Sequence, residues 1–296
     1  LAISAKAEWA ERSNHDLKGY WPETSVHIGA EIGPHDVDGH GYKHWWKMFN
    51  PTQLLIHAQL LKAIATKSEY SAASREVALG ALQQYLRNQN CFTLWNIGAD
   101  KLEPMFSSGN FQPKSTTVEN NIFGDFGRGN WKACASGIVE GIEWKQRVYE
   151  LAGKQNVARE SVDLSESIQG KSIQVATGDN VLDNVKIYCG SSTDLSANVN
   201  EGTIDLVITD PPFGELIQYA ELADFFYAWL RLPLGHIYPE YFSNEQTPKA
   251  LEAVGNRVRQ VDPDEDYKTI LQACWAEAYR ILKPRYPRFH FSPQQR

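Results

Sequence analysis

The 296-residue sequence contains only four cysteines, two methionines and no long apolar run. The cysteines are scattered without a Cys-x-x-Cys pair, which is typical of buried thiols in a reducing compartment and provides no zinc site. No stretch approaches the ~18 consecutive apolar residues of a membrane span, and the first residues are too charged for a signal peptide. The eight histidines lack metal-ligand spacing. We therefore expect a cytoplasmic protein with no membrane segment and no metal.

An excess of positive charge is also missing. The chain has 29 basic and 36 acidic residues, which gives a net charge of -7. A small protein that coats nucleic acid without sequence preference is normally basic, so this balance argues against such a role. An enzyme with a local basic groove stays compatible with it. The hydrophobic content of 42% and the charged content of 22% are typical of a soluble globular protein.

The first half of the chain, residues 1–155, is predicted to be mainly helical with a long loop. Asn50, Pro51 and Gln53 have the spacing of an N-cap, a first helical residue and a capping-box partner. Apolar residues recur at helical spacing after them. Loops as long as the one predicted here are often functional. The predicted elements are an irregular segment up to Lys43, a helix from Pro51, helices over 72–87 and 131–151, and the loop between the last two helices.

The second half, residues 156–296, has a different pattern. Short β-branched runs bounded by Gly, Asp, Asn and Ser predict strands, and longer periodic runs after them predict helices. Strands that alternate with helices indicate part of an open α/β sheet. The predicted strands cover 172–177, 185–189 and 204–209, and the predicted helices cover 219–230, 248–259 and 263–282.

One tetrapeptide of the sequence indicates a ligand-binding site. The apolar run over 204–209 predicts a buried strand, and it ends in Asp210, Pro211, Pro212 and Phe213. In an open α/β sheet, ligands bind beyond the carboxyl ends of the strands, where this motif is expected to lie. At average residue frequencies Asp-Pro-Pro-aromatic occurs by chance at about one position in 10⁵. A plain Asp-Pro turn with a core phenylalanine is the alternative.

These residue types suit the binding of an exocyclic amine of a base. Such a nitrogen is a poor nucleophile until acceptors bind both of its N–H groups. The Asp210 carboxylate and the Pro211 carbonyl can supply them, and the two prolines restrict the backbone that holds them. A flipped base can stack on Phe213, for roughly 1–3 kcal/mol. Tyr219 and Glu221 follow within one turn of the motif's exit, and we expect them to line the pocket.

The sequence resembles the adenine-specific DNA methylases that carry a zinc ribbon. Besides the Asp-Pro-Pro-Phe motif, the similarity rests on KIYCGSS at 186–192, YAELADFFYAWL at 219–230, FNPTQLL at 49–55 and ENNIFGDFGRGNW at 119–131. The resemblance implies a Rossmann-like methyltransferase fold, S-adenosylmethionine as cofactor and DNA as partner. It implies that Asp210, Pro211, Pro212 and Phe213 form the catalytic site for the target amine.

The chain departs from that family in two places. The only glycine cluster, at 123–129, follows no buried strand and reads better as a connection than as a cofactor loop, so the cofactor-binding residues are unknown. The zinc ribbon is absent, and the last residues do not continue as the family does. We therefore expect a fragment, with an upstream half of the same enzyme as a further partner.

Two other functions stay open. Asp-Pro-Pro-aromatic motifs also serve methyltransferases of RNA amines and of protein amides. The chain could equally be a non-catalytic remnant or a module that binds a partner, since the cofactor loop is missing. Transfer of labelled methyl groups to DNA, RNA or protein separates the enzymatic alternatives.

Overall fold

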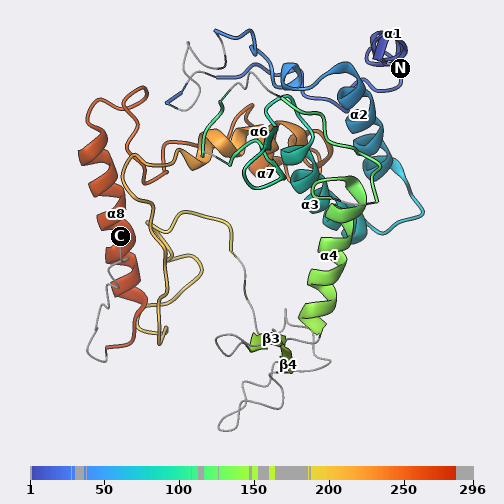
Figure 1. Cartoon of the computed structure of the whole chain (residues 1–296). Coiled ribbons are helices and arrows are strands. Elements are labelled where there is room, and N and C mark those ends of the chain that lie inside the picture. Colours follow the sequence, from blue (N-terminus) through green and yellow to red (C-terminus); the bar gives the residue numbers. More distant parts are fainter. Residues whose placement is uncertain are drawn as a thin grey trace.

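The computed structural model describes most of the chain and contains helices with short strands (Figure 1). The described residues are 2–27, 29–30, 37, 39–107, 109–112, 117–125, 127–146, 149–152, 160–163, 186 and 188–284. The helices are α1 (Ala2–Arg12), the 3-10 helix η1 (Trp45–Met48), α2 (Pro51–Thr66), α3 (Ala72–Asn88), α4 (Trp131–Gln146), α6 (Tyr219–Leu234), α7 (Pro239–Phe242) and α8 (Pro263–Ile281). The strands are β1 (Leu94–Asn96), β2 (Lys101–Glu103), β3 (Tyr149–Ala152) and β4 (Glu160–Asp163).

Local capping sets where the first long helices begin. The Asn50 side chain accepts a hydrogen bond from the Gln53 amide (2.9 Å), and the Gln53 side chain accepts one from the Asn50 amide (3.0 Å). This reciprocal box satisfies two amides that the helix itself leaves free. Ser71 caps α3 with one such bond, since its hydroxyl accepts from the Ser74 amide (3.1 Å). The predicted starts at Pro51 and near Ala72 are thus confirmed.

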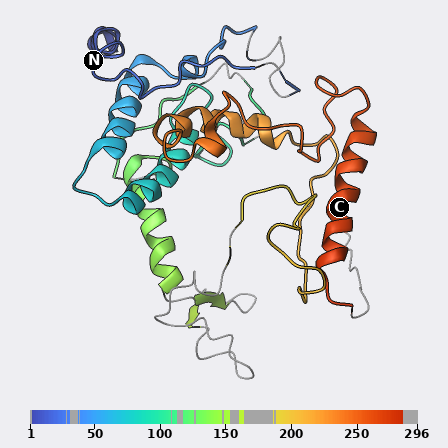
Figure 2. The same cartoon turned by 180° about the vertical axis from the view of Figure 1, so that it is seen from behind.

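The hydrophobic core joins helices from both halves of the sequence. Figures 1 and 2 show α2, α3 and α6 grouped together, with α4 extending from them. The α6 side chains Phe225 and Trp229 are fully buried. Both contact Phe49, and Trp229 also contacts His57, with ring centroids 5.3–6.0 Å apart. Each such aromatic side chain buries a large apolar area, so α6 stabilises the region formed by the first half.

The helix α8 lies apart from this core, beside the segment that leads to the Asp-Pro-Pro-Phe motif (Figures 1 and 2). The Ile204 amide donates to the Ile281 carbonyl (2.9 Å), and the Lys283 amide donates to the Ile204 carbonyl (2.9 Å). Ile204 and Leu282 form a single parallel bridge. The end of α8 therefore holds the start of this segment.

The expected parallel sheet is not found among the described residues. The pairs present there are β1 with β2 and β3 with β4, both antiparallel. The prediction of a strand over 204–209 is wrong for the structure, because apart from the bridge at Ile204 no neighbouring strand in the described part pairs with it. The predicted strand at 172–177 lies outside the described residues. Around the one predicted at 185–189, the described residues Lys186, Tyr188 and Cys189 are not in a strand.

Two helix predictions also need correction. Residues 248–259 form turns, because the Asn256 side chain accepts from the amides of Val258 (3.0 Å) and Arg259 (3.1 Å) and so competes with helical bonding. The segment expected to be irregular up to Lys43 begins with α1, which sequence periodicity did not reveal. The helix predicted over 131–151 ends at Gln146. Within the described part of the chain, every helix is too short or too polar to span a bilayer.

Candidate functional site

The Asp-Pro-Pro-Phe motif lies at the surface, at the end of an extended segment. Leu206 and Ile208 within that segment are 69% and 83% exposed, and the Phe213 ring is 49% exposed. Asp210 is exposed as well. Within the described part of the chain, its carboxylate and the Pro211 carbonyl have no hydrogen-bond partner. The motif therefore offers, at consecutive positions, two acceptors without a partner in the described part and one half-exposed aromatic ring.

The other end of the motif is held from two directions. The Tyr267 hydroxyl of α8 donates to the Pro212 carbonyl (2.9 Å). The Gly255 amide donates to the Gly214 carbonyl (3.1 Å), and the Arg257 guanidinium pairs with the Glu215 carboxylate (3.0 Å). Gly214 has φ +59°, which lets the chain turn immediately after Phe213 at no steric cost. The chain that follows the motif is thus held in a fixed turn, whereas Asp210 at the start of the motif is exposed.

The two residues expected to line the pocket have different surroundings. Tyr219 is the first residue of α6 and is half-exposed, but no ring contact or hydrogen bond in the described part links it to the motif. Glu221 is only 1% exposed. Its carboxylate accepts from the Ala30 amide (3.1 Å) and the Asn256 side chain (2.7 Å), and lies 3.6 Å from the Arg259 guanidinium. We correct its expected role from substrate contact to structural support.

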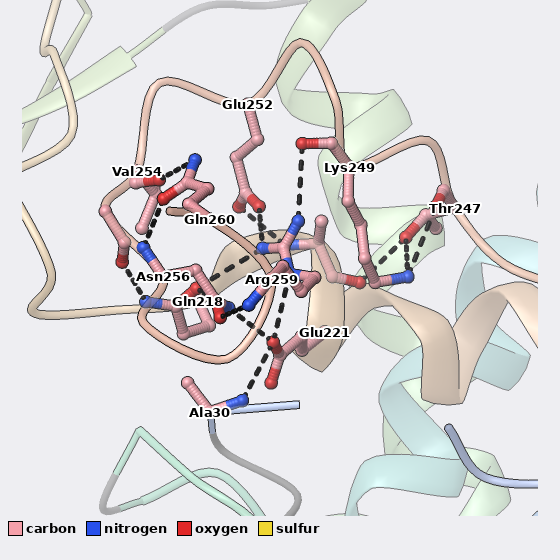
Figure 3. A network of polar contacts seen from close by, with 12 residues as sticks. Ala30, Gln218, Glu221, Thr247, Lys249, Glu252, Val254, Asn256, Arg259 and Gln260 are labelled. Carbon is pink, nitrogen blue, oxygen red and sulfur yellow. Dashed lines mark hydrogen bonds and ion pairs between the residues drawn. The ribbon is translucent and has the colours of Figure 1, made fainter. Parts of the chain in front are cut away.

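A buried polar network surrounds Glu221 and connects the motif's exit to the rest of the molecule (Figure 3). Asn256 donates to Gln218 (2.7 Å), and Gln218 donates to the Gly255 carbonyl (2.8 Å). Arg259 pairs with Glu252 (3.3 Å). Because buried charges are costly unless they are paired and hydrogen-bonded, this set of partners keeps the network in one arrangement.

A second ion pair on α6 extends this network. The Asp224 carboxylate is 4% exposed and receives the Lys249 ammonium at 2.6 Å. It also accepts from the Thr247 amide (2.7 Å) and hydroxyl (2.6 Å). These contacts hold the segment after α7 against α6. A cavity of about 650 Å³ opens beside it and includes none of the expected site residues; its lining consists of His27, residues 244–249 and Arg259.

We identify no cradle for S-adenosylmethionine around the described glycines. In the glycine cluster at 123–129, the Gly129 carbonyl accepts from the buried Gln89 side chain (2.8 Å), and a side chain at Gly129 would collide with Asn88. Gly129 therefore packs against the end of α3, whereas a side chain at Gly127 would meet no atom within 4 Å. Near the motif, Gly214 has a positive φ, and its carbonyl is bonded to the Gly255 amide.

Comparisons of the chain with protein-family models, with curated proteins and with solved structures found no match. No group of three or more His, Cys, Asp or Glu side chains that could hold a metal occurs in the described ranges. Any assignment of function therefore rests on the geometry of the motif and on the sequence resemblance.

The open part of the motif can bind a planar amine. Two acceptors beside an aromatic face match a group with two N–H donors on a flat ring. Sequence reasoning found these residues but missed Tyr267, Asn256 and Arg259, which hold the motif's exit. Their contacts join residues 35 to 55 positions apart, and no local pattern marks them.

Proposed function

We propose that this chain carries the amine-binding site of an S-adenosylmethionine-dependent methyltransferase that acts on the exocyclic amine of adenine in DNA. The observation that carries the proposal is the pair of unoccupied acceptors, the Asp210 carboxylate and the Pro211 carbonyl, beside the half-exposed ring of Phe213. The resemblance to the zinc-ribbon adenine methylases supplies the choice of base and of polymer.

The residues act by positioning. Asp210 and the Pro211 carbonyl accept the two N–H groups of the amine, which draws its lone pair out of conjugation with the ring. Phe213 stacks on the extruded base and holds the amine at the acceptors. S-adenosylmethionine would supply the methyl group, and the residues of the motif bind and orient the amine that accepts it. No nucleophilic side chain and no covalent intermediate are required.

The segment before the motif has main-chain groups that are open to pairing. In the described part, Leu206 and Ile208 are 69% and 83% exposed, and the main-chain groups of residues 205–211 have no hydrogen-bond partner. A row of unpaired main-chain groups is unfavourable by itself and is normally paired or covered. The motif therefore follows a segment on which a binding partner can act through the backbone.

The test is transfer of a labelled methyl group from S-adenosylmethionine by the 296-residue chain. We expect label on adenine in duplex DNA, and we expect Asp210→Ala to lower the rate by about a hundredfold or more, as loss of a preorganised hydrogen-bonding group does elsewhere. Glu201→Ala, which removes an exposed carboxylate that has no hydrogen-bond partner among the described residues, is the matched control and should retain the rate.

Three outcomes would contradict the proposal. Label on transfer or ribosomal RNA but not on DNA would assign an RNA enzyme, and label on protein amides would assign a protein methyltransferase. Absence of label, together with absence of S-adenosylhomocysteine binding by calorimetry to the folded chain, would indicate a non-catalytic module.

A further inference from the structure

The two prolyl carbonyls of the motif have different partners. The Pro212 carbonyl receives the Tyr267 hydroxyl at 2.9 Å, whereas no partner in the described part reaches the Pro211 carbonyl. We infer that Tyr267 is a positioning residue, which occupies one carbonyl and thereby directs a bound amine to the other. This inference rests on the proposed function.

The backbone of the motif explains why one hydrogen bond has a large effect there. Each proline fixes φ near -65° and has no N–H, so the motif cannot hold itself in place through amide donors. The rotation that remains is about ψ. A donor on the Pro212 carbonyl fixes the peptide plane after Pro212, and this restricts the neighbouring plane that contains the Pro211 carbonyl.

The helix α8 gives Tyr267 a rigid base. Asp262 caps the helix by accepting from the Glu265 amide (3.1 Å), and Pro263 follows as the first helical residue. Tyr267 lies one turn further on and is partly buried. The hydroxyl is therefore carried by the ordered start of a 19-residue helix.

The same helix also holds the other end of the segment. Ile204 bonds to Ile281 and Lys283 at the carboxyl end of α8, while Pro212 bonds to Tyr267 near the amino end. The fourteen helical residue steps from Tyr267 to Ile281 span about 21 Å. The eight residue steps from Ile204 to Pro212 span about 26 Å when fully extended. These similar lengths mean that α8 keeps the segment nearly extended. Tyr267 therefore sets where the motif ends.

The sequence offers a direct probe of this hydrogen bond. Pro212–Phe213 is the only Pro-Phe step in the chain. Labelling proline carbonyls with ¹³C and phenylalanine amides with ¹⁵N thus gives one carbonyl–amide NMR correlation, which reports on the Pro212 carbonyl. We expect Tyr267→Phe to shift this signal, because the ring is kept and only the donor is lost. Tyr279→Phe removes an exposed hydroxyl from the same helix and should leave the signal in place.

The functional consequence is measured by methyl transfer with the same variants. We expect Tyr267→Phe to lower the turnover number tenfold to roughly a hundredfold, since small misplacements near a reacting group have effects of this size. The KM for S-adenosylmethionine should stay unchanged, and Tyr279→Phe should match the parent chain. An unshifted NMR signal, or equal turnover in Tyr267→Phe, overturns the inference. Absence of transfer in every variant would instead overturn the proposed function, and the NMR signal would still decide whether Tyr267 holds the motif.

Discussion

A single buried histidine illustrates how strongly the core constrains one residue. His57 is fully buried between α2 and α3, and both ring nitrogens are bonded: Nε2 lies 2.9 Å from the Gln89 carbonyl and Nδ1 lies 3.1 Å from the Tyr85 hydroxyl. The two contacts are satisfied by a neutral ring that donates from Nε2 and accepts at Nδ1. Burial lowers the pKa of His57 from 6.5 to about 4.

This lowered pKa predicts an acid-sensitive fold. Between pH 6.5 and 4 the unfolded chain takes up a proton that folded His57 does not, so the free energy of unfolding falls as the pH falls through this window. The loss is on the order of 3 kcal/mol over the whole window and about 2 kcal/mol between pH 7 and pH 5. Urea unfolding at pH 7 and pH 5 measures it. His57→Gln should reduce this pH dependence, while His236→Gln, at an exposed site, should keep it. Equal pH dependence in all three chains would contradict the prediction.

At the scale of elements, helices with a complete local signal were predictable. The Asn50 and Gln53 box fixes the start of α2 whatever surrounds it, and Asp262 with Pro263 does the same for α8. The region 248–259 has apolar spacing but folds as turns, because the Asn256 side chain accepts from the Val258 amide and donates to the Glu221 carboxylate, 35 residues away. That competition depends on tertiary contacts, which periodicity does not contain.

Asn256 is accordingly predicted to stabilise more than its own turn. Asn256→Ala would remove donors from Glu221 and Gln218 and leave a buried carboxylate with fewer partners. We expect the free energy of unfolding to fall by about 2–3 kcal/mol. Asn198→Ala, at an exposed site where the side chain has no hydrogen-bond partner among the described residues, should change it by less than about 0.5 kcal/mol. Urea titration measures both. A similar small effect for the two variants would show that the network contributes little.

For the whole molecule, the sequence identified the motif but not its setting. Asp210 to Phe213 were recognisable because a rare tetrapeptide follows an apolar run, and the structure leaves them open at the surface. The expected role of Glu221 could not be judged from its position after the motif, since its burial depends on Ala30 and Asn256. The parallel sheet was inferred from strand-like segments, yet a sheet forms only where such segments pair with one another. Among the described residues, 204–209 pairs only with the residue after α8, through Ile204 and Leu282.

The placement of α6 leads to a last prediction about how the chain folds. The soft boundary near residue 155 separates α6 from α2 and α3 in sequence, but Phe225 and Trp229 complete their core. Loss of one such aromatic side chain costs about 3–5 kcal/mol, and a typical domain has a stability of only about 5–15 kcal/mol. Residues 1–155 alone should therefore lack a cooperative thermal transition in near-ultraviolet circular dichroism.

A longer fragment provides the control for this prediction. Residues 1–260 keep α6 and omit α8, whose fully buried side chains are only Ala278 and Ile281. This fragment should retain a cooperative transition, and Trp229→Ala in the full chain should lower the melting temperature. If residues 1–155 alone melted as sharply as the full chain, the first half would be a domain in its own right and α6 an addition to it. If residues 1–155 alone showed no cooperative transition, α6, the helix that follows the motif, would be part of the folding unit. The site and the core would then form together.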